Sequence, residues 1–130
     1  MSRASQHDGL QQVDGQVIVD AGRVTEFEVE KIYRQFAVLC IDKQVRRVLV
    51  RPGDADPAAE RALRVALTSM VLAGLPSGFK LALVVASAHI EARYRDTERD
   101  LRMAGVETKI FPTDDGASRW LRESRSPSSG

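Results

Sequence analysis

The sequence is poor in the residues on which small secreted, metal-binding and membrane proteins depend. Its single cysteine, Cys40, excludes an internal disulfide and fits a reducing compartment. Its two histidines have no metal-ligand spacing, so we expect no metal and no cofactor. No apolar run approaches the roughly 18 residues of a membrane span, and residues 1–8 lack the apolar segment of a secretory signal. We therefore expect a cytoplasmic protein without a transmembrane segment.

A strong excess of basic charge is also missing. The net charge is +1 and the isoelectric point about 7.9, which leaves little attraction for a phosphate backbone and excludes nucleic acid as an expected partner. The 130 residues are 43% hydrophobic and 28% charged, the balance of one globular domain. We assign this single α/β domain to residues 9–123 and expect residues 1–8 and the Ser/Pro/Gly tail 124–130 to be disordered.

Residues 79–86, FKLALVVA, form an almost unbroken apolar run between Gly78 and Ser87. The length, the branched residues and the flanks favour a strand over a helix. Apolar residues at successive positions indicate that both faces of this strand are covered, as in the middle of a parallel sheet between helices. Only Lys80 interrupts the run, near its start, where we expect the ammonium group to reach water.

The rest of the chain alternates between strand-like and helix-like segments. Asp14-Gly15 between two short strand-like runs predicts an N-terminal β-hairpin. The alternation that follows predicts a mixed, mostly parallel sheet of about five strands with four helices, and leaves the strand order open. The predicted strands are 10–13, 16–21, 45–51, 79–86 and 106–111, and the predicted helices begin at the caps Thr25, Asp56 and Ser87 and at Asp114.

The second of these helices carries more apolar residues than one buried face requires. Its predicted core stripe is Ala59, Leu63, Ala66, Met70 and Ala73. Outside that stripe lies a candidate interface of Val65, Val71, Leu72 and Leu75. A monomer would not need this extra apolar surface, so we expect another element, a protein partner or a second copy of the chain to cover it. On the first helix, Cys40 falls on the apolar stripe, which predicts a buried, unreactive thiol.

Polar residues follow several predicted strands at their carboxyl ends, where open α/β sheets bind ligands. Ser87 and His89 could act as nucleophile and base, but side chains two positions apart at a helix start diverge. No Gly-x-Ser-x-Gly elbow surrounds Ser87, and helix capping explains both Ser87 and Asp56. We therefore expect no enzymatic activity. The candidate ligand or partner site at this edge is Arg51, Asp54, Asp56, Ser87 and His89.

Taken together, these elements resemble the SpoIIAA-like family, small proteins with the fold of STAS domains and of CRAL-TRIO lipid-binding domains. The resemblance covers roughly residues 10–122 as a pattern of elements, and it implies a SpoIIAA/STAS-like fold. Its more specific pieces are Gly22-Arg23-Val24-Thr25, Lys80-Leu81-Ala82-Leu83-Val84, and Ile110-Phe111 followed by Ala117 and Trp120-Leu121.

The resemblance also carries an expectation about function. In STAS domains of the anti-sigma-factor antagonist type, a serine at the start of the second long helix is phosphorylated and controls partner binding. The corresponding residues 50–57, VRPGDADP, contain no Ser or Thr, so we do not expect that switch here. The resemblance places the second helix beside a partner-binding region and implies a non-enzymatic regulatory or interaction module. The alternative is a small-molecule or lipid carrier of the CRAL-TRIO type.

Overall fold

The computed structural model of the chain describes residues 10–13, 15–21, 26–52 and 57–123. The expected disordered ends and the predicted caps Thr25 and Asp56 lie outside the described residues. The elements follow in the order β1 (Leu10–Val13), β2 (Gln16–Asp20), α1 (Glu26–Lys43), β3 (Arg47–Arg51), α2 (Pro57–Ala73), β4 (Lys80–Val84), α3 (Ala88–Met103), β5 (Glu107–Phe111) and α4 (Asp114–Arg122).

The strands form one five-stranded sheet in the order β1-β2-β3-β4-β5. Strand β1 is antiparallel to β2, and all other neighbours are parallel. This confirms the predicted α/β class with a mixed, mostly parallel sheet and four helices. Strand β4 is buried on both faces as expected, but it is second from the edge, and β3 is the central strand.

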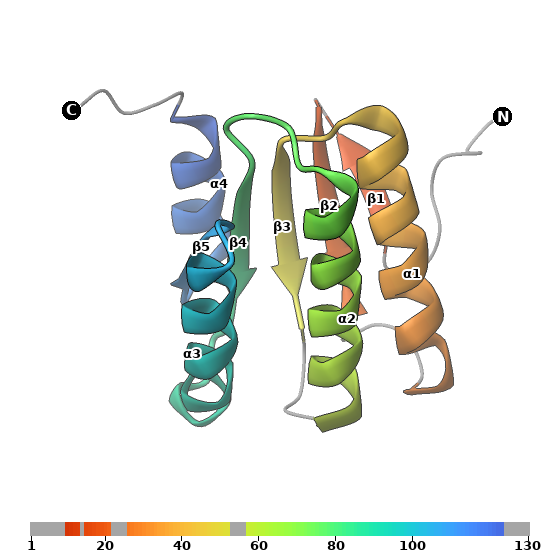
Figure 1. Cartoon of the computed structure of the whole chain (residues 1–130). Coiled ribbons are helices and arrows are strands. Elements are labelled where there is room, and N and C mark those ends of the chain that lie inside the picture. The colour runs from red at the N-terminus through yellow and green to blue at the C-terminus, as the bar shows by residue number, and fades with distance from the viewer. Residues whose placement is uncertain (1–9, 14, 22–25, 53–56, 124–130) are drawn as a thin grey trace, which may run out of the picture.

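Because consecutive parallel strands are neighbours, right-handed crossovers carry α1, α2 and α3 to the same face of the sheet. Figure 1 shows these three helices side by side in front of the strands. The main core lies between them and the sheet, with Tyr33, Phe36, Leu63, Leu81 and Leu83 all fully buried. Helix α4 covers the opposite face. A second, smaller core cluster there consists of Leu49, Ala82, Ala117 and Leu121.

Local sequence signals explain several boundaries. Gly15 has a φ of 75°, which the tight turn between β1 and β2 requires. The Ser87 hydroxyl caps α3 by accepting a hydrogen bond from the Ile90 backbone N–H at 3.4 Å, as predicted. Thr113 caps α4 in the same way, accepting from the Gly116 N–H at 3.3 Å. None of the helices in the described part of the chain has the length and apolarity to cross a bilayer.

The predicted core stripe of α2 was partly wrong. Ala73 was assigned to the core stripe of α2 but is exposed, because it is the last residue of the helix, whereas Leu67 was not assigned to it and is buried. The Lys80 ammonium group also contacts the protein, which was not predicted. Its Nζ donates to the backbone carbonyls of Trp120 and Glu123, both at 2.9 Å, at the end of α4.

Candidate functional site

At the carboxyl ends of the strands, an arginine is held between two carboxylates. Arg51 ends β3, and its guanidinium donates to Asp114 at the start of α4, with Nε–Oδ1 at 3.0 Å and Nη2–Oδ2 at 2.6 Å. Its Nη1 also lies 3.5 Å from Oδ2 of Asp20, which ends β2. The parallel register places Asp20 directly beside Arg51. The arrangement joins two strands to the first turn of α4.

The hydrogen bonds from Arg51 lower the pKa of the Asp114 carboxyl below its usual range. The same hydrogen bonds raise the pKa of Arg51, which is charged in any case. Both partners are already bonded, and about two-thirds of the Arg51 side chain is covered. An ion cluster of this kind fixes α4 against the sheet, so its donors are engaged within the chain.

The predicted polar site is only partly assembled. Arg51 lies at the expected edge, but Asp54 and Asp56 lie outside the described residues. The Ser87 hydroxyl is used as the α3 cap, and the His89 side chain is exposed on the first turn of that helix. Neither bonds to Arg51 within the described residues. The described part of the chain also contains no group of three His, Cys, Asp or Glu side chains suited to a metal ion.

Sequence reasoning missed Asp20. The signal was available in principle, because Asp20 ends one predicted strand and Arg51 ends the next. In parallel strands, such ends meet at one edge of the sheet. The pairing depends on β2 and β3 being neighbours, and the sequence left the strand order open.

The buried reactive groups are poorly suited to chemistry. Cys40 is buried, as expected, and burial raises the pKa of its thiol to about 12. At neutral pH the nucleophilic thiolate is therefore almost absent. Tyr33 is also fully buried, and burial raises the pKa of its hydroxyl well above the ordinary value. Both side chains belong to the packing between α1 and the sheet.

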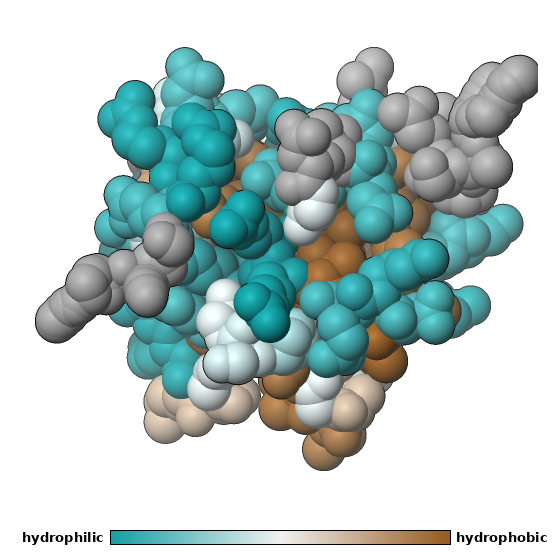
Figure 2. Space-filling model, turned by 90° about the horizontal axis from the view of Figure 1, so that it is seen from above, coloured by the Kyte–Doolittle hydropathy of each residue, from teal (hydrophilic) through white to brown (hydrophobic). Residues whose placement is uncertain are grey.

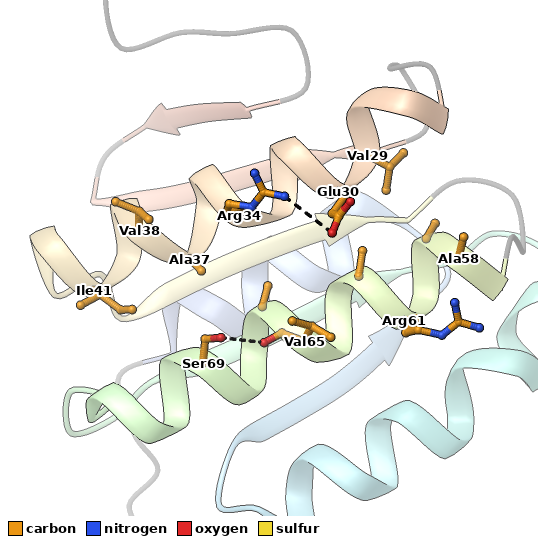
Figure 3. A pocket seen from close by; sticks show the side chains of 13 residues that line it. Val29, Glu30, Arg34, Ala37, Val38, Ile41, Ala58, Arg61, Val65 and Ser69 are labelled. Atoms are coloured by element: carbon orange, nitrogen blue, oxygen red, sulfur yellow. Dashed lines mark hydrogen bonds and ion pairs between the residues drawn. The ribbon is translucent and has the colours of Figure 1, made fainter.

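The second candidate site is a groove between α1 and α2 on the outer surface of the helical layer (Figure 3). Its volume is about 560 Å³. Much of the lining consists of short side chains, so the two helices leave a hollow that larger residues would have filled. Val38 of α1 and Val65 of α2 stand at its two sides (Figure 3). The small residues that line it are Ala37, Ala58, Ala59, Ala62, Ala66 and Ser69.

The groove adjoins most of the exposed apolar surface of the described residues. Four large apolar side chains are exposed among the described residues: Val38 at 61%, Val65 at 60%, Leu72 at 82% and Met103 at 80%. Three of the four belong to α1 and α2. Figure 2, which views the molecule from above, shows apolar surface gathered on the side of the helical layer.

The structure divides the predicted interface of α2 into two pairs. Val65 and Leu72 are exposed, as the prediction requires, whereas Val71 and Leu75 are half-buried and pack against the main core. Val38 was not predicted, because the interface was sought on α2 alone. The available signal was an apolar residue off the inner stripe of α1.

Several polar groups near the groove are bonded within the chain. Arg34 lies 3.6 Å from Glu30 on α1. The Ser69 hydroxyl donates to the backbone carbonyl of Val65 at 3.0 Å, so it needs no water partner. Arg64 turns away from the groove to Asp100 of α3, at 2.7 Å. The groove lining also includes Arg61, an exposed arginine one turn before Val65 on α2.

One solved structure is similar over nearly the whole length of the chain. The NMR structure of the protein TM1081 matches with a TM-score of 0.61, covering 95% of this chain and 94% of that one, at 18% sequence identity. The chain is similar in fold to TM1081. At this identity the likeness to TM1081 concerns the fold alone. No protein-family model and no curated protein matches the sequence.

Proposed function

We propose that this chain is a cytoplasmic, non-enzymatic regulatory module of the STAS-like type that acts by binding protein. Its docking surface is the α1–α2 face, which we define as Val38, Val65, Leu72 and the alanine-lined groove. The observation that carries the proposal is the exposure of Val38 and Val65 on the two sides of that groove. A concave apolar surface between two helices is a common site for protein docking.

The chemistry of the surroundings supports binding of protein in preference to catalysis. The hydroxyls of Ser87 and Thr113 serve as helix caps, and Arg51 is bonded to Asp114. A reaction would require some of these groups to be released from structural hydrogen bonds. The segment 50–57, where the resemblance expects a phosphorylated serine, has no hydroxyl residue. We therefore propose no regulation by phosphorylation of this segment.

A lipid or small-molecule carrier is the second candidate. The groove volume of about 560 Å³ lies within the range of ligand pockets, which is the observation in its favour. Native mass spectrometry of the freshly purified chain separates the two functions. A carrier would show a discrete added mass of a few hundred daltons that organic extraction removes.

Site-specific photo-crosslinking in cells tests the docking surface directly. A benzoylphenylalanine placed at Val65 should give a covalent adduct with a protein when the cells are irradiated. The same probe at Met103 is a control, because Met103 is also apolar and is at least as exposed as Val65 but lies on α3. Mass spectrometry of the adduct identifies the captured chain.

The proposal requires that position 65 gives an adduct and position 103 does not. Adducts of equal yield at both positions would indicate contact without a defined docking surface and would contradict it. No adduct at position 65 would contradict it as well, provided the labelled chain is folded by circular dichroism.

A further inference from the structure

Strand β5 is an edge of the sheet, on the opposite side from β1 (Figure 1). Among the described residues, no strand pairs with its outer side. The carbonyl of Phe111 accepts a hydrogen bond from the Val85 N–H, on the β4 side, at 2.8 Å. Backbone groups of successive residues in a strand point to opposite sides, so those of Thr108 and Ile110 point outward. A further strand would bond to these outward groups.

The side chain of Arg102 covers part of this edge. It comes from the last turn of α3, and its Nε donates to the Thr108 carbonyl at 2.8 Å. Its Nη2 also donates to Oε2 of Glu98, one turn earlier on the same helix, at 3.4 Å. The guanidinium therefore lies where the N–H of a neighbouring strand would lie.

The backbone beside this contact is open. A groove of about 480 Å³ lies along the start of β5. It is lined by residues 105–109, by Arg102 of α3 and by Trp120 of α4. The described helices thus leave space at the edge, and an extended chain is the kind of partner that binds an open strand.

The charges of β5 are self-complementary. Glu107 and Lys109 are exposed, and residues two positions apart in a strand lie on the same face. If two β5 strands pair in the antiparallel direction about Thr108, Glu107 of each copy lies opposite Lys109 of the other. Opposite charges that face each other across two strands stabilise the pair. In this register the two Thr108 residues exchange both backbone hydrogen bonds.

The neighbouring registers are less favourable. With Glu107 or Lys109 at the centre, that residue would face its own copy, which places two like charges opposite each other. With Ile110 at the centre, Thr108 would face Pro112, which has no N–H to donate. Charge and hydrogen bonding together select the register about Thr108.

We propose that β5 is an edge for pairing with β5 of a second copy, and that Arg102 blocks this pairing. The two strands are related by a two-fold axis, so the contact is isologous. While Arg102 holds the Thr108 carbonyl, a second β5 cannot bond there. Removal of the arginine side chain opens the edge. The inference goes beyond the proposed function and does not depend on it, because β5 lies outside the α1–α2 face.

Size-exclusion chromatography with light scattering tests the block on the purified full chain between about 5 and 500 μM. The parent should stay near 14.3 kDa. The mass of Arg102→Ala should rise toward twice that value, with association at least about tenfold tighter than in the parent. Arg99→Ala is the matched control, because it removes another exposed, ion-paired arginine from α3 and should behave as the parent. Circular dichroism verifies that each variant is folded.

Charge reversal in the Arg102→Ala chain tests the register. Glu107→Lys and Lys109→Glu should each weaken association about tenfold, because each places like charges opposite each other twice. The two together should restore it to within about threefold. Hydrogen exchange followed by NMR should show that the N–H groups of Thr108 and Ile110 become protected in the dimer.

The outcomes separate the parts of the inference. An Arg102→Ala chain that associates no more tightly than the parent would overturn the block. Association that is indifferent to Lys109→Glu, or that leaves Thr108 and Ile110 unprotected, would overturn pairing through β5. Failure of the combined charge reversal would overturn the register. Val65→Asp in the Arg102→Ala chain should leave association unchanged, whereas its loss would mean that the copies meet through the α1–α2 face instead.

Discussion

On one face of the sheet, three helices bury whole aromatic and aliphatic side chains, among them Tyr33, Phe36 and Met70. On the other face, α4 has nine residues and docks through Ala117 and Leu121. The apolar area available to α4 is much smaller. A helix this short is only marginally stable on its own, so its attachment to the sheet has to supply most of its stability.

The attachment of α4 to the sheet is partly ionic, and the charges at its two ends match the direction of the helix dipole. Arg51 of β3 binds Asp114 at the N-terminus of α4, and Lys80 of β4 binds the carbonyls at its C-terminus. The Lys80 ammonium also lies 4.8 Å from the centre of the Trp120 ring. An acidic first turn and a cation at the last carbonyls both complement the helix dipole. We call the side of the sheet covered by α1, α2 and α3 the large face, and the side covered by α4 the small face. Packing of buried side chains stabilises the large face. A few apolar residues and an ionic contact at each end of α4 stabilise the small face.

The largest effect is expected on the large face. Leu83 of β4 is fully buried in the main core, so Leu83→Ala removes buried methyl groups and leaves a cavity. We expect a loss of about 2–5 kcal/mol in the free energy of unfolding, enough to threaten folding of a domain of this size. Urea unfolding followed by circular dichroism measures it. A loss below about 1 kcal/mol would show that this face does not depend on packed volume.

A smaller and more local effect is expected on the α4 face. Leu121 is also fully buried, but it is held by one short helix that can shift to close the space. We expect Leu121→Ala to cost about 2 kcal/mol, the lower end for such changes. Hydrogen exchange should show lost protection in α4 with little change in α1 and α2. Uniform loss of protection in all helices would instead show that α4 and the large face unfold as one unit.

The sequence predicts the large face better than the small one, for a physical reason. The strand at 79–86 and the inner stripes of α1 and α2 can be recognised from the local spacing of apolar residues, because packing against a sheet requires that spacing. The contact of Arg51 with Asp114 joins residues 63 positions apart. It depends on strand order and on the place of α4, which no local pattern encodes.

The sequence predicted the α1–α2 face only in part. The sequence identified an excess of apolar residues on α2, and Val65 and Leu72 are indeed exposed. It could not assign Val71 and Leu75 to the core, because their burial depends on where the end of α2 meets its neighbours. It also could not join Val38 to the surface, since the groove forms only when α1 and α2 lie side by side.

The ionic contact of α4 should depend on pH. Because Arg51 lowers the pKa of Asp114 in the folded chain, the pair contributes stability fully above the ordinary carboxyl pKa of about 4. That contribution is lost as the pH falls through the lower pKa of the folded state. Both groups are partly exposed, so we expect Arg51→Gln to cost no more than about 1 kcal/mol at pH 7, and less below pH of about 3.

Unfolding of the parent and Arg51→Gln chains at several pH values measures this difference. Arg93→Gln provides the control, because Arg93 is exposed and forms no ion pair within the described residues. A cost for Arg51→Gln that stays constant from pH 7 to below about 3 would contradict a contact that requires the charged form of Asp114.

The smallest effect is expected on the outer surface of α3, which faces solvent and does not contact the sheet. Arg95 pairs with Glu91 at 2.7 Å, but its side chain is 66% exposed. Water and salt weaken such a pair, and ordering two long side chains costs entropy. Arg95→Ala should therefore cost well under about 1 kcal/mol in urea unfolding. A cost as large as that of Arg51→Gln would mean that the contacts of α4 gain nothing from being anchored on the sheet, and the contrast between the two faces would then rest on buried volume alone.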